Sequence, residues 1–524
     1  MPQFSIVTPV FNPPVWAFEE CISSVLSQEF EDWEWCLCDD SSTNPEISRR
    51  LSELQQSDPR IHLILRDANG GIVAASNDAL SMASGEYVVL LDHDDSLSFE
   101  ALKVVNELLT FCPDTDYVYS DEDKVDSDGN HFDVFHKPAW APERLLGQNY
   151  CCHLSVIRRS LVTEVGGFRE GFDGSQDYDL ILRIVELAKS IRHIPEVLYH
   201  WRVVEGSTAL DQFAKPYAFE AARRAVDEHL KRRNIEAEVL TTIHGFQKIV
   251  RKLHNFPMVS IIIPSGAFSQ EVWGSNRLLL NSAITSIIEK SSYPNFEIIV
   301  VLDTNKFRDD PTLQSTLQHE RVVVVDYDKP FDFSDKCNVG AVVAQGDIVL
   351  FLNDDMEVIS SDWLETLVGH LLDPNVGMVG ARLLFENETI QSAGHTNDPS
   401  PHSFGLGQSK DDPGMFGNLA IAQERSGLTG ACFALSRDLY MQVGGMSRVY
   451  PHCFNDVDLC YKVLETGKTL IWTPFADLYH FESLSRDPTP RPKEIELLYG
   501  RWSRHFGEDK YLPQPKKFYW DEES

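Results

Sequence analysis

The sequence has few basic residues for its length. Its 524 residues include 46 lysines and arginines against 80 aspartates and glutamates, so the formal net charge is −34 at pH 7. Binding to a nucleic-acid backbone or to an anionic membrane surface depends on clustered lysine and arginine side chains. We therefore expect no nucleic-acid partner and at most a peripheral association with a membrane.

Long apolar runs and paired cysteine motifs are also absent. No run of about 18 apolar residues occurs, so we expect no membrane-spanning helix. The opening MPQFSIVTPVFN predicts a strand rather than a basic and then apolar leader peptide. The ten cysteines are scattered, without a CxxC motif or a cysteine and histidine spacing typical of zinc sites. Reduced, buried cysteines are typical of the cytoplasm, which is where we expect the protein.

Internal similarity predicts two copies of one domain. A chain of this length exceeds the size of a single core. Residues 77–95, NDALSMASGEYVVLLDHDD, align without a gap with residues 338–356, NVGAVVAQGDIVLFLNDDM. EVGGF and QVGGM, QDYDL and NDVDL, and LYHWR and LYHFE match further along in the same order. We predict a first domain at 1–210, a helical linking subdomain at 211–255 and a second domain at 256–524.

Each copy alternates short apolar strands with amphipathic helices, which is typical of βαβ units and a largely parallel sheet. In the first copy we expect strands at SIVTPV, WEWCLC, IHLIL and YVVLLD, with helices at about 17–28, 46–56 and 72–83. Ligands of open α/β sheets bind beyond the carboxyl ends of the strands. Asp39 and Asp92 lie at two such ends.

The stretch GEYVVLLDHDDSL ends an apolar strand in three aspartates, Asp92, Asp94 and Asp95. Aspartate favours strand exits because its side chain bonds nearby backbone amides, so a purely structural role is one interpretation. The other is a cation, Mg²⁺ or Mn²⁺, held by one or two carboxylates and completed by substrate phosphates. This stretch alone leaves both open.

Two further positions allow a structural and a chemical interpretation. The acids of GSQDYDL suit the first turn of a helix, but Asp177 could also be a general base for an acceptor hydroxyl. His200 is either hydrogen-bonded among aromatic residues or a ligand of a metal such as Mn²⁺. A strand-end acid, a helix-start acid and a histidine share no packing reason to occur together in both copies. A metal ligand, a base and a further ligand do share a chemical reason. The matched pairs are Asp94 with Asp355, Asp177 with Asp456, and His200 with His480.

The order of these motifs resembles family 2 glycosyltransferases of the GT-A fold. The similarity runs from residue 3 to about 490 through SIVTPVFN, CDDSS, SGEYVVLLDHDD, VGGF, SQDYDL and LYHWR. It implies an α/β fold class with two GT-A domains in tandem, which are Rossmann-like nucleotide-diphospho-sugar transferases. YSDEDKVDSDG, KPAWAPERLLGQNY and FLNDDMEV resemble bacterial two-domain members that build surface polysaccharides, including O-antigen and rhamnan-type transferases.

The resemblance also implies a role for each candidate residue. The nucleotide sugar would be bound by Pro9, Phe11, Asp39, Asp92, Asp303 and Asn353. The cation, Mn²⁺ or Mg²⁺, would be bound by Asp94, His200, Asp355 and His480. The catalytic bases would be Asp177 and Asp456.

In the second copy, Asp303 is expected at the position of Asp39. Two departures from the family pattern fall in this copy. Asn353 replaces the first acid of the DxD motif, and PSGAFSQEVWGS differs from the usual opening.

The implied reaction is an inverting, metal-dependent transfer of sugars from nucleoside diphosphate sugars to a growing surface glycan. A cation neutralises the charge that develops on the diphosphate, and one ionised carboxylate accepts the acceptor proton. A glycosidase would instead need two carboxylates flanking the bond. The acceptor suggested by the resemblance is lipid-linked at the inner face of the membrane.

The two copies differ in the distance between the metal motif and the base. Asp94 and Asp177 are 83 positions apart, whereas Asp355 and Asp456 are 101 positions apart. The extra residues lie around SAGHTNDPSPHSFGLGQSKDDPGMFGN, which is rich in glycine, proline and serine and predicts a loop. We therefore expect different donors or acceptors, and two linkages from two active sites.

Two alternatives are weighed against this interpretation. A sugar nucleotidylyltransferase would need a glycine-rich phosphate loop near the first strand, and TPVFNPPVW has none. In the other alternative, only the first domain is active, and the second is a degenerate scaffold or a glycan-binding module. Asn353 favours this alternative, and the retained Asp456 and His480 argue against it.

Overall fold

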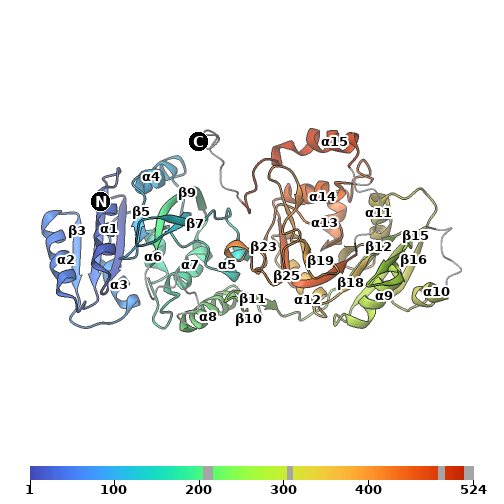
Figure 1. Ribbon diagram of the computed structural model, residues 1–524, viewed down its shortest axis with the longest axis horizontal. Helices are drawn as coiled ribbons and strands as arrows, with labels where there is room; N and C mark the ends of the chain where they lie inside the picture. Colours follow the sequence, from blue (N-terminus) through green and yellow to red (C-terminus); the bar gives the residue numbers. More distant parts are fainter. Residues whose placement is uncertain (204–215, 304–310, 452, 482–489, 513–524) are drawn as a thin grey trace. The chain divides into compact units, whose positions relative to one another are not determined.

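The chain forms two compact units. The computed structural model describes residues 1–203, 216–303, 311–451, 453–481 and 490–512 (Figure 1). Unit 1 comprises Met1–Trp140 and Leu145–Ile249, and unit 2 comprises Ala141–Arg144 and Val250–Gln514. The division after Ile249 falls inside the segment predicted as a linking subdomain, so most of that segment belongs to unit 1. Each unit is described by itself.

Unit 1 is built on a mixed sheet of nine strands. The strand order is β3-β2-β1-β4-β8-β6-β9-β5, with β7 paired to β6. The strands β1 to β4 are parallel, β8 is antiparallel to β4 and β6, and β6 is parallel to β9. The bounds are β1 (Phe4–Val10), β2 (Trp33–Asp39), β3 (Ile61–Leu65), β4 (Tyr87–Leu90), β5 (Ser96–Leu97), β6 (Tyr117–Val125), β7 (His131–Phe135), β8 (Ser155–Arg158) and β9 (Ile191–Arg202).

Helices cover both faces of the parallel part of this sheet. Side chains from alternate positions of β1 pack with α1, α2 and α4 in one core cluster. Right-handed crossovers place α3 on the opposite face, because the chain reverses direction across the sheet between β3 and β4. The bounds are α1 (Val15–Leu26), α2 (Pro45–Ser57), α3 (Ile72–Met82), α4 (Ala101–Phe111), α5 (Pro142–Gly147), α6 (Arg159–Glu164), α7 (Gln176–Leu187) and α8 (Pro216–Arg232). The three helices predicted in the first copy are confirmed to within a few residues.

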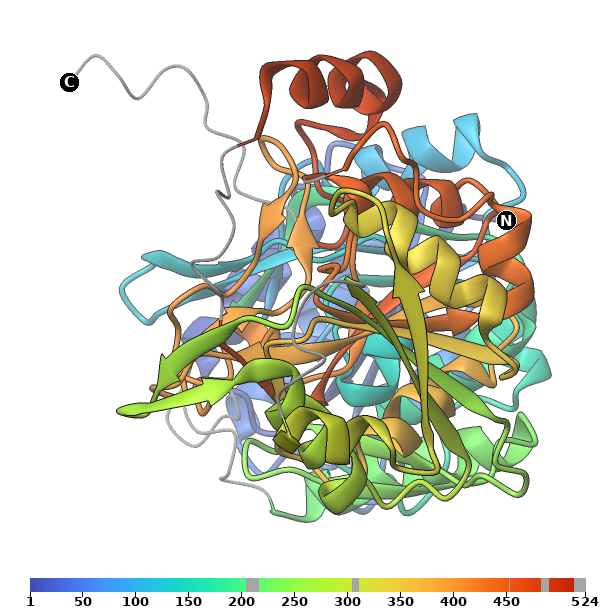
Figure 2. The ribbon, with the colours of Figure 1, turned by 90° about the vertical axis from the view of Figure 1, so that its right-hand side faces the viewer.

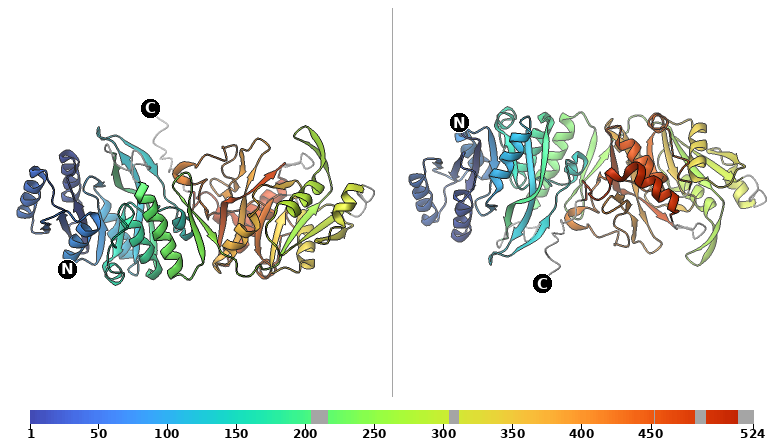
Figure 3. Two further views of the ribbon diagram at one scale, coloured as in Figure 1. Left: turned by 90° about the horizontal axis from the view of Figure 1, so that it is seen from below. Right: turned by 90° about the horizontal axis from the view of Figure 1, so that it is seen from above.

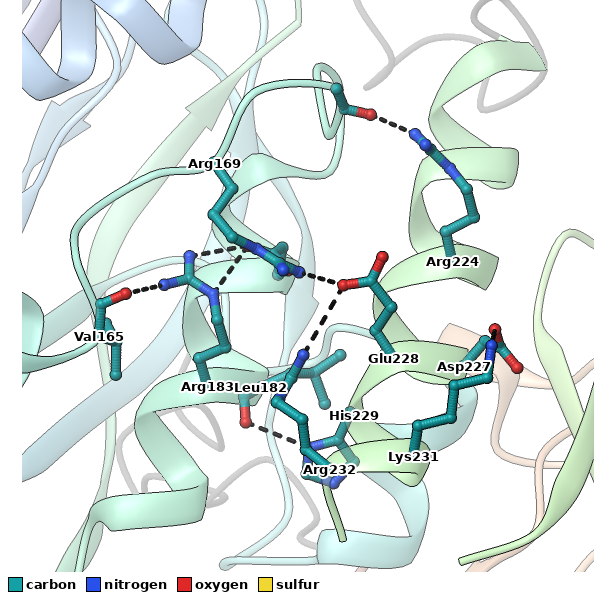
Figure 4. A network of polar contacts seen from close by, with 12 residues as sticks. Val165, Arg169, Leu182, Arg183, Arg224, Asp227, Glu228, His229, Lys231 and Arg232 are labelled. Atoms are coloured by element: carbon teal, nitrogen blue, oxygen red, sulfur yellow. Dashed lines mark hydrogen bonds and ion pairs between the residues drawn. The ribbon is translucent and has the colours of Figure 1, made fainter. Parts of the chain in front are cut away.

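The basic helix α8 packs beside α7 in unit 1 (Figure 3). Arg232 Nη2 lies 2.8 Å from Glu186 Oε1. Arg169 Nη2 lies 2.8 Å from Glu228 Oε2 (Figure 4). Arg183 also pairs with the fully buried Asp179 at 2.7 Å. The pairs of Arg232 with Glu186 and of Arg169 with Glu228 hold α8 on α7 and on the segment before it, whereas the pair of Arg183 with Asp179 lies within α7. The antiparallel pair β10 (Ala237–Thr241) and β11 (Gln247–Arg251) follows α8.

Unit 2 repeats the topology of unit 1. Its strand order, β16-β15-β12-β17-β24-β19-β25-β18, matches that of unit 1 strand for strand. The repeated topology confirms the two copies expected from the sequence. The bounds are β12 (Val259–Ser265), β15 (Phe296–Asp303), β16 (Val322–Tyr327), β17 (Ile348–Leu352), β18 (Met356–Val358), β19 (Val376–Leu384), β24 (Cys432–Ser436) and β25 (Thr469–His480).

Alternate residues of β12 face two different helix layers in unit 2. Ile261 and Ile263 pack with residues of α9 and α12, whereas Ile262 packs with residues of α11, α13 and α14. This alternation is what a parallel strand buried on both faces requires. The bounds are α9 (Leu279–Lys290), α10 (Pro311–Leu317), α11 (Phe333–Val343), α12 (Trp363–Leu371), α13 (Arg437–Gln442), α14 (Asn455–Leu464) and α15 (Pro492–Trp502).

Unit 2 carries short strands that unit 1 lacks in its described part. A hairpin of β13 and β14 lies apart from the main sheet (Figure 2). The glycine- and proline-rich stretch predicted as a loop contains further short strands. The bounds are β13 (Ser269–Val272), β14 (Ser275–Leu278), β20 (Ile390–Ser392), β21 (His395–Thr396), β22 (His402–Ser403) and β23 (Gln423–Glu424). Among the described residues, no helix has both the length and the apolar character that crossing a membrane requires.

Candidate active sites

The predicted nucleotide-contacting residues of unit 1 lie at the carboxyl ends of β1 and β2. Asp39 ends β2, is buried, and accepts a hydrogen bond from the Ser42 amide at 3.2 Å. The side chain of Phe11 follows β1 and is 44% exposed. His93 Nδ1 donates to the carbonyl oxygen of Pro9 at 3.0 Å, which connects the end of β1 to the acidic stretch. An exposed ring beside a buried acid suits a ligand that is both flat and polar.

The neighbouring acid, Asp40, is occupied by protein contacts. Its two carboxylate oxygens accept the amide hydrogens of Gly70 and Gly71, each at 2.8 Å. Arg66 Nε lies 2.9 Å from the same carboxylate. Gly71 has a φ of 85°, which favours glycine at this turn. Asp40 therefore closes the loop before α3, and Asp39 is the acid left at the sheet edge.

Asp92 and Asp95 converge with a histidine that the sequence analysis did not single out. The ligand atoms of Asp92, Asp95 and His153 all lie within 4.8 Å of one another. Tyr199 Oη donates to Asp95 Oδ2 at 2.6 Å, and the Arg202 amide donates to Asp95 Oδ1 at 2.7 Å. Burial raises the pKa of both aspartates, and the charge of Asp94 adds to this rise. The charge of Asp92 raises the pKa of Asp95 further.

His153 carries positive charge into this acidic cluster. Its Nδ1 lies 3.2 Å from Glu122 Oε2, and its ring stacks on Tyr199 with centroids 4.6 Å apart. Burial opposes protonation, but the hydrogen bond to Glu122 and the surrounding carboxylates raise the pKa of His153 to about 9. The buried Lys137 lies 3.5 Å from the same Glu122 oxygen. No motif could have identified His153, because its position depends on the antiparallel pairing of β8 with β4.

Asp177 lies in the first turn of α7, as predicted. Asn149 Nδ2 donates a hydrogen bond to Asp177 Oδ2 at 2.9 Å. After burial, the charge of Asp177 is among those that raise the pKa of Asp92, so the two carboxylates lie in one electrostatic environment. Helix α7 thus presents a half-buried carboxylate to the acidic cluster at the edge of the sheet.

In unit 2, the residues predicted to bind a cation do meet. His480 Nε2 lies 3.2 Å from Asp355 Oδ1 and 3.3 Å from Asn353 Nδ2. His480 Nδ1 is hydrogen-bonded to Gln391, which fixes the ring. Within the part of the chain that the structure describes, the amide oxygen of Asn353 is buried without a hydrogen-bond partner. The neighbouring Asp354 is half-buried, and desolvation raises its pKa to about 6.

His200 lies in different surroundings from its counterpart. Its Nδ1 contacts Asp123 Oδ1 at 2.6 Å, and Asp123, His131 and His200 form a candidate ligand group separate from that of Asp92. Whether His200 and Asp94 share a cation stays a prediction.

Strand register explains the difference between the two histidines. His200 pairs with Ser96 across β5 and β9, whereas His480 pairs with Met356 across β18 and β25. The sequence repeat aligns Met356 with Asp95, so the two registers differ by one residue. A slip of one residue moves a side chain to the other face of a strand.

The nucleotide-side residues of unit 2 also differ from those of unit 1. The last register pair of β1 and β2 is Val10 with Asp39, and that of β12 and β15 is Ser265 with Leu302. Asp303 therefore corresponds to Asp40, which corrects its expected equivalence with Asp39.

Asp303 is paired with a buried lysine. Lys336 is fully buried, and its Nζ lies 2.5 Å from Asp303 Oδ1 and 2.6 Å from the carbonyl oxygen of Ser265.

Asp456 lies in the first turn of α14, as Asp177 does in α7. The Gly430 amide donates to Asp456 Oδ2 at 2.7 Å, and the Val457 amide donates to Asp456 Oδ1 at 2.8 Å. Two backbone donors thus hold the predicted base of unit 2, where a side-chain amide holds that of unit 1.

Comparison with known proteins agrees with this geometry. Residues 5–166 and 276–444 match the description Glycosyl transferase family 2. The chain belongs to this family. The recognition made from the motifs is confirmed, as is the α/β fold class with a repeated GT-A-like domain.

The relatives of this family 2 chain include proteins of polysaccharide synthesis. It is 39% identical over 98% of its length to protein y4gI of Sinorhizobium fredii, and 33% identical over 98% to the O-antigen biosynthesis protein RfbC of Myxococcus xanthus. It spans 57% and 40% of these two proteins, or about half their length. Over 39% of the chain it is 30% identical to a chondroitin synthase of Escherichia coli, of which it covers 29%. A Staphylococcus aureus TarS structure, residues 1–349, aligns with a TM-score of 0.37 and 19% identity over 45% of this chain and 67% of that one.

Proposed function

We propose that the chain transfers sugars from nucleoside diphosphate sugars to a growing surface glycan by an inverting, metal-dependent reaction. Membership of family 2 supports sugar transfer, and the O-antigen and chondroitin proteins among its relatives support a polysaccharide product. The observation that carries the proposal is the convergence of Asp92, Asp95 and His153 at the strand edge of unit 1.

The donor set of unit 1 fits a divalent cation such as Mn²⁺ or Mg²⁺. Asp92 and Asp95 supply carboxylate oxygens, the ligands that these cations prefer. A bound cation would displace the proton of His153, and the neutral imidazole nitrogen would then favour Mn²⁺. The predicted ligand Asp94 lies in the same stretch, with its backbone carbonyl held by Arg202 Nε at 2.8 Å. A cation bound there would neutralise charge on the leaving diphosphate.

Asp177 is the proposed base of unit 1. Its carboxylate accepts the proton of the acceptor hydroxyl as that hydroxyl attacks the anomeric carbon from the face opposite the diphosphate. The hydrogen bond from Asn149 occupies Oδ2 and leaves Oδ1 for the acceptor. Asp39, Pro9 and Phe11 at the ends of β1 and β2 would contact the nucleotide.

Unit 2 is proposed to form a second linkage. Asp456 takes the role of base, and Asp355, His480 and Asn353 lie together as a cation site would require. The buried amide oxygen of Asn353, which has no hydrogen-bond partner among the described residues, would be satisfied by a cation or by a donor hydroxyl.

A second candidate is that unit 2 binds glycan without turnover. The observation that favours it is the buried ion pair of Lys336 with Asp303 at the carboxyl ends of β12 and β15. Unit 2 has Leu302 at the position of Asp39, the acid expected to bond the nucleotide, and the acid that follows is engaged by this pair. Binding of Mn²⁺ and a nucleoside diphosphate at unit 2 would decide against this candidate.

The setting that fits this reaction is the cytoplasm, at the inner face of a membrane that carries a lipid-linked acceptor. The acidic composition suits peripheral attachment through a partner or the acceptor itself, because an anionic lipid surface would repel the chain.

The proposal is tested by donor turnover with the intact protein. A panel of nucleoside diphosphate sugars is incubated with glycan fragments and Mn²⁺, and the released nucleoside diphosphate is measured. Asp94→Asn is expected to lower turnover of the donor used by unit 1 about tenfold or more, and to leave turnover of the donor used by unit 2 unchanged. Asp67→Asn removes the same charge from an exposed acid and is expected to leave turnover unchanged. Equal turnover in both variants would refute the proposed site.

A further inference from the structure

A second group of potential metal ligands lies on the sheet of unit 1. Asp123 is on β6, and His131 and His200 come from β7 and β9, which both pair with β6. Asp123 Oδ1 lies 2.6 Å from His200 Nδ1, and Asp123 Oδ2 lies 2.9 Å from His131 Nδ1. The ligand atoms of the three residues all lie within 4.8 Å of one another.

This group is separate from the cluster at Asp92. In the register of β6 with β9, Glu122 pairs with Tyr199, and Asp123 pairs with His200. Successive residues of a strand point to opposite faces of the sheet. Glu122 and Tyr199 both contact His153 on the face of the acidic cluster. Asp123 and His200 therefore point to the other face.

We propose that Asp123, His131 and His200 bind a divalent transition cation of the Zn²⁺ class. Two imidazole nitrogens and one carboxylate are a common protein ligand set for Zn²⁺, with water in the remaining position. Asp123 is buried at 6% exposure, whereas the side chain of His131 is 49% exposed and leaves a path for the ion. The proposal does not rest on the proposed transfer reaction.

The ligand set is confined to unit 1. Tyr479 in unit 2 pairs with Leu384, where Tyr199 in unit 1 pairs with Glu122. The residue after Leu384 is Phe385, so unit 2 has no carboxylate at the position of Asp123. The proposed ion would join β7 to β9 across β6. His200 would then be a ligand of this ion and not of the cation predicted at Asp94.

Zinc binding by the intact protein tests the proposal. Metal-free protein competes with a chromophoric chelator for Zn²⁺, and affinity and stoichiometry are compared between the wild type and His131→Asn. The matched control is His136→Asn. His136 Nδ1 is hydrogen-bonded at 3.0 Å to Asp121, which lies on β6 as Asp123 does, but His136 belongs to no such ligand group among the described residues. Half of the His131 side chain is already exposed, so its substitution is expected to leave the circular dichroism spectrum unchanged.

The expected result is that His131→Asn loses one equivalent of Zn²⁺ or binds it at least about tenfold more weakly, while His136→Asn binds as the wild type does. Addition of His200→Asn to His131→Asn is expected to cause no further loss of this equivalent. Identical binding by all variants would overturn the proposal and leave a carboxylate bonded by two imidazoles. Equal losses in His131→Asn and His136→Asn would also overturn it, because the loss would then be unspecific. Binding is measured without donor sugar, so a failure of the proposed function leaves this test intact.

Discussion

Asn149 provides a sharp test of how unit 1 positions its proposed base, Asp177. Its side-chain amide donates to Asp177 Oδ2 at 2.9 Å. A hydrogen bond to a charged group contributes about 1.5 to 3 kcal/mol. If Asn149→Ala loses this positioning in the transition state, kcat falls about 10- to 150-fold at about 1.4 kcal/mol per tenfold change. The KM for the donor should change little, because Asn149 holds the base and not the nucleotide.

The assay is steady-state release of nucleoside diphosphate at saturating donor and acceptor. Asn130→Ala is a matched control, because Asn130 Nδ2 donates to the carboxylate of Asp126 at 3.0 Å in an exposed turn of the same unit. Its kcat should equal that of the wild type. Asn149→Ala should cause no further loss in an Asp177→Asn background, since residues that act through one another are not additive. A kcat for Asn149→Ala within about twofold of the wild type would refute the positioning role.

Two further predictions concern pH and the proposed metal motif of unit 2. Glu34 is buried, and although burial opposes this, hydrogen bonds from Ser5, Ser84 and Gly85 lower the pKa of its carboxyl. The stability that Glu34 contributes is therefore present above its unfolded pKa of about 4.3 and is lost as pH falls towards its lower folded pKa. Glu34→Gln should thus make the thermal midpoint of unfolding fall less steeply between about pH 5 and 3. An unchanged slope would contradict this. Asn353→Asp places an acid at the first position of the motif, beside His480. By analogy with the effect of site residues on metal affinity, it should tighten Mn²⁺ binding, measured by calorimetry, about tenfold. Unchanged affinity would show that no cation binds there.

The elements of the fold were largely predictable from the sequence. Apolar alternation and the helical period located the strands and helices of the first copy, and the gapless repeat around the acidic stretch predicted the second. Asp177 and Asp456 were predictable as first-turn acids because helix starts have a local signature. These features depend on short segments of chain, and short segments carry their own signals.

The remaining details depend on pairing between distant strands. His153 reaches Asp92 only because β8 runs antiparallel to β4, and no spacing in the sequence encodes that contact. The tripeptide LYH occurs in both copies, yet a register difference of one residue brings His480 to Asp355 and His200 to Asp123. Register is set by the packing of whole strands, so identical motifs can present different faces.

The measurement that tests the account most directly is the identity of the linkages made by the intact protein and by Asp177→Asn and Asp456→Asn. The products from glycan fragments and the full donor panel are analysed by mass spectrometry and nuclear magnetic resonance. The account predicts that each substitution removes a different linkage and lowers its rate by about 10²- to 10⁴-fold, as expected for loss of a general base. Formation of both linkages at the wild-type rate by Asp177→Asn would contradict it.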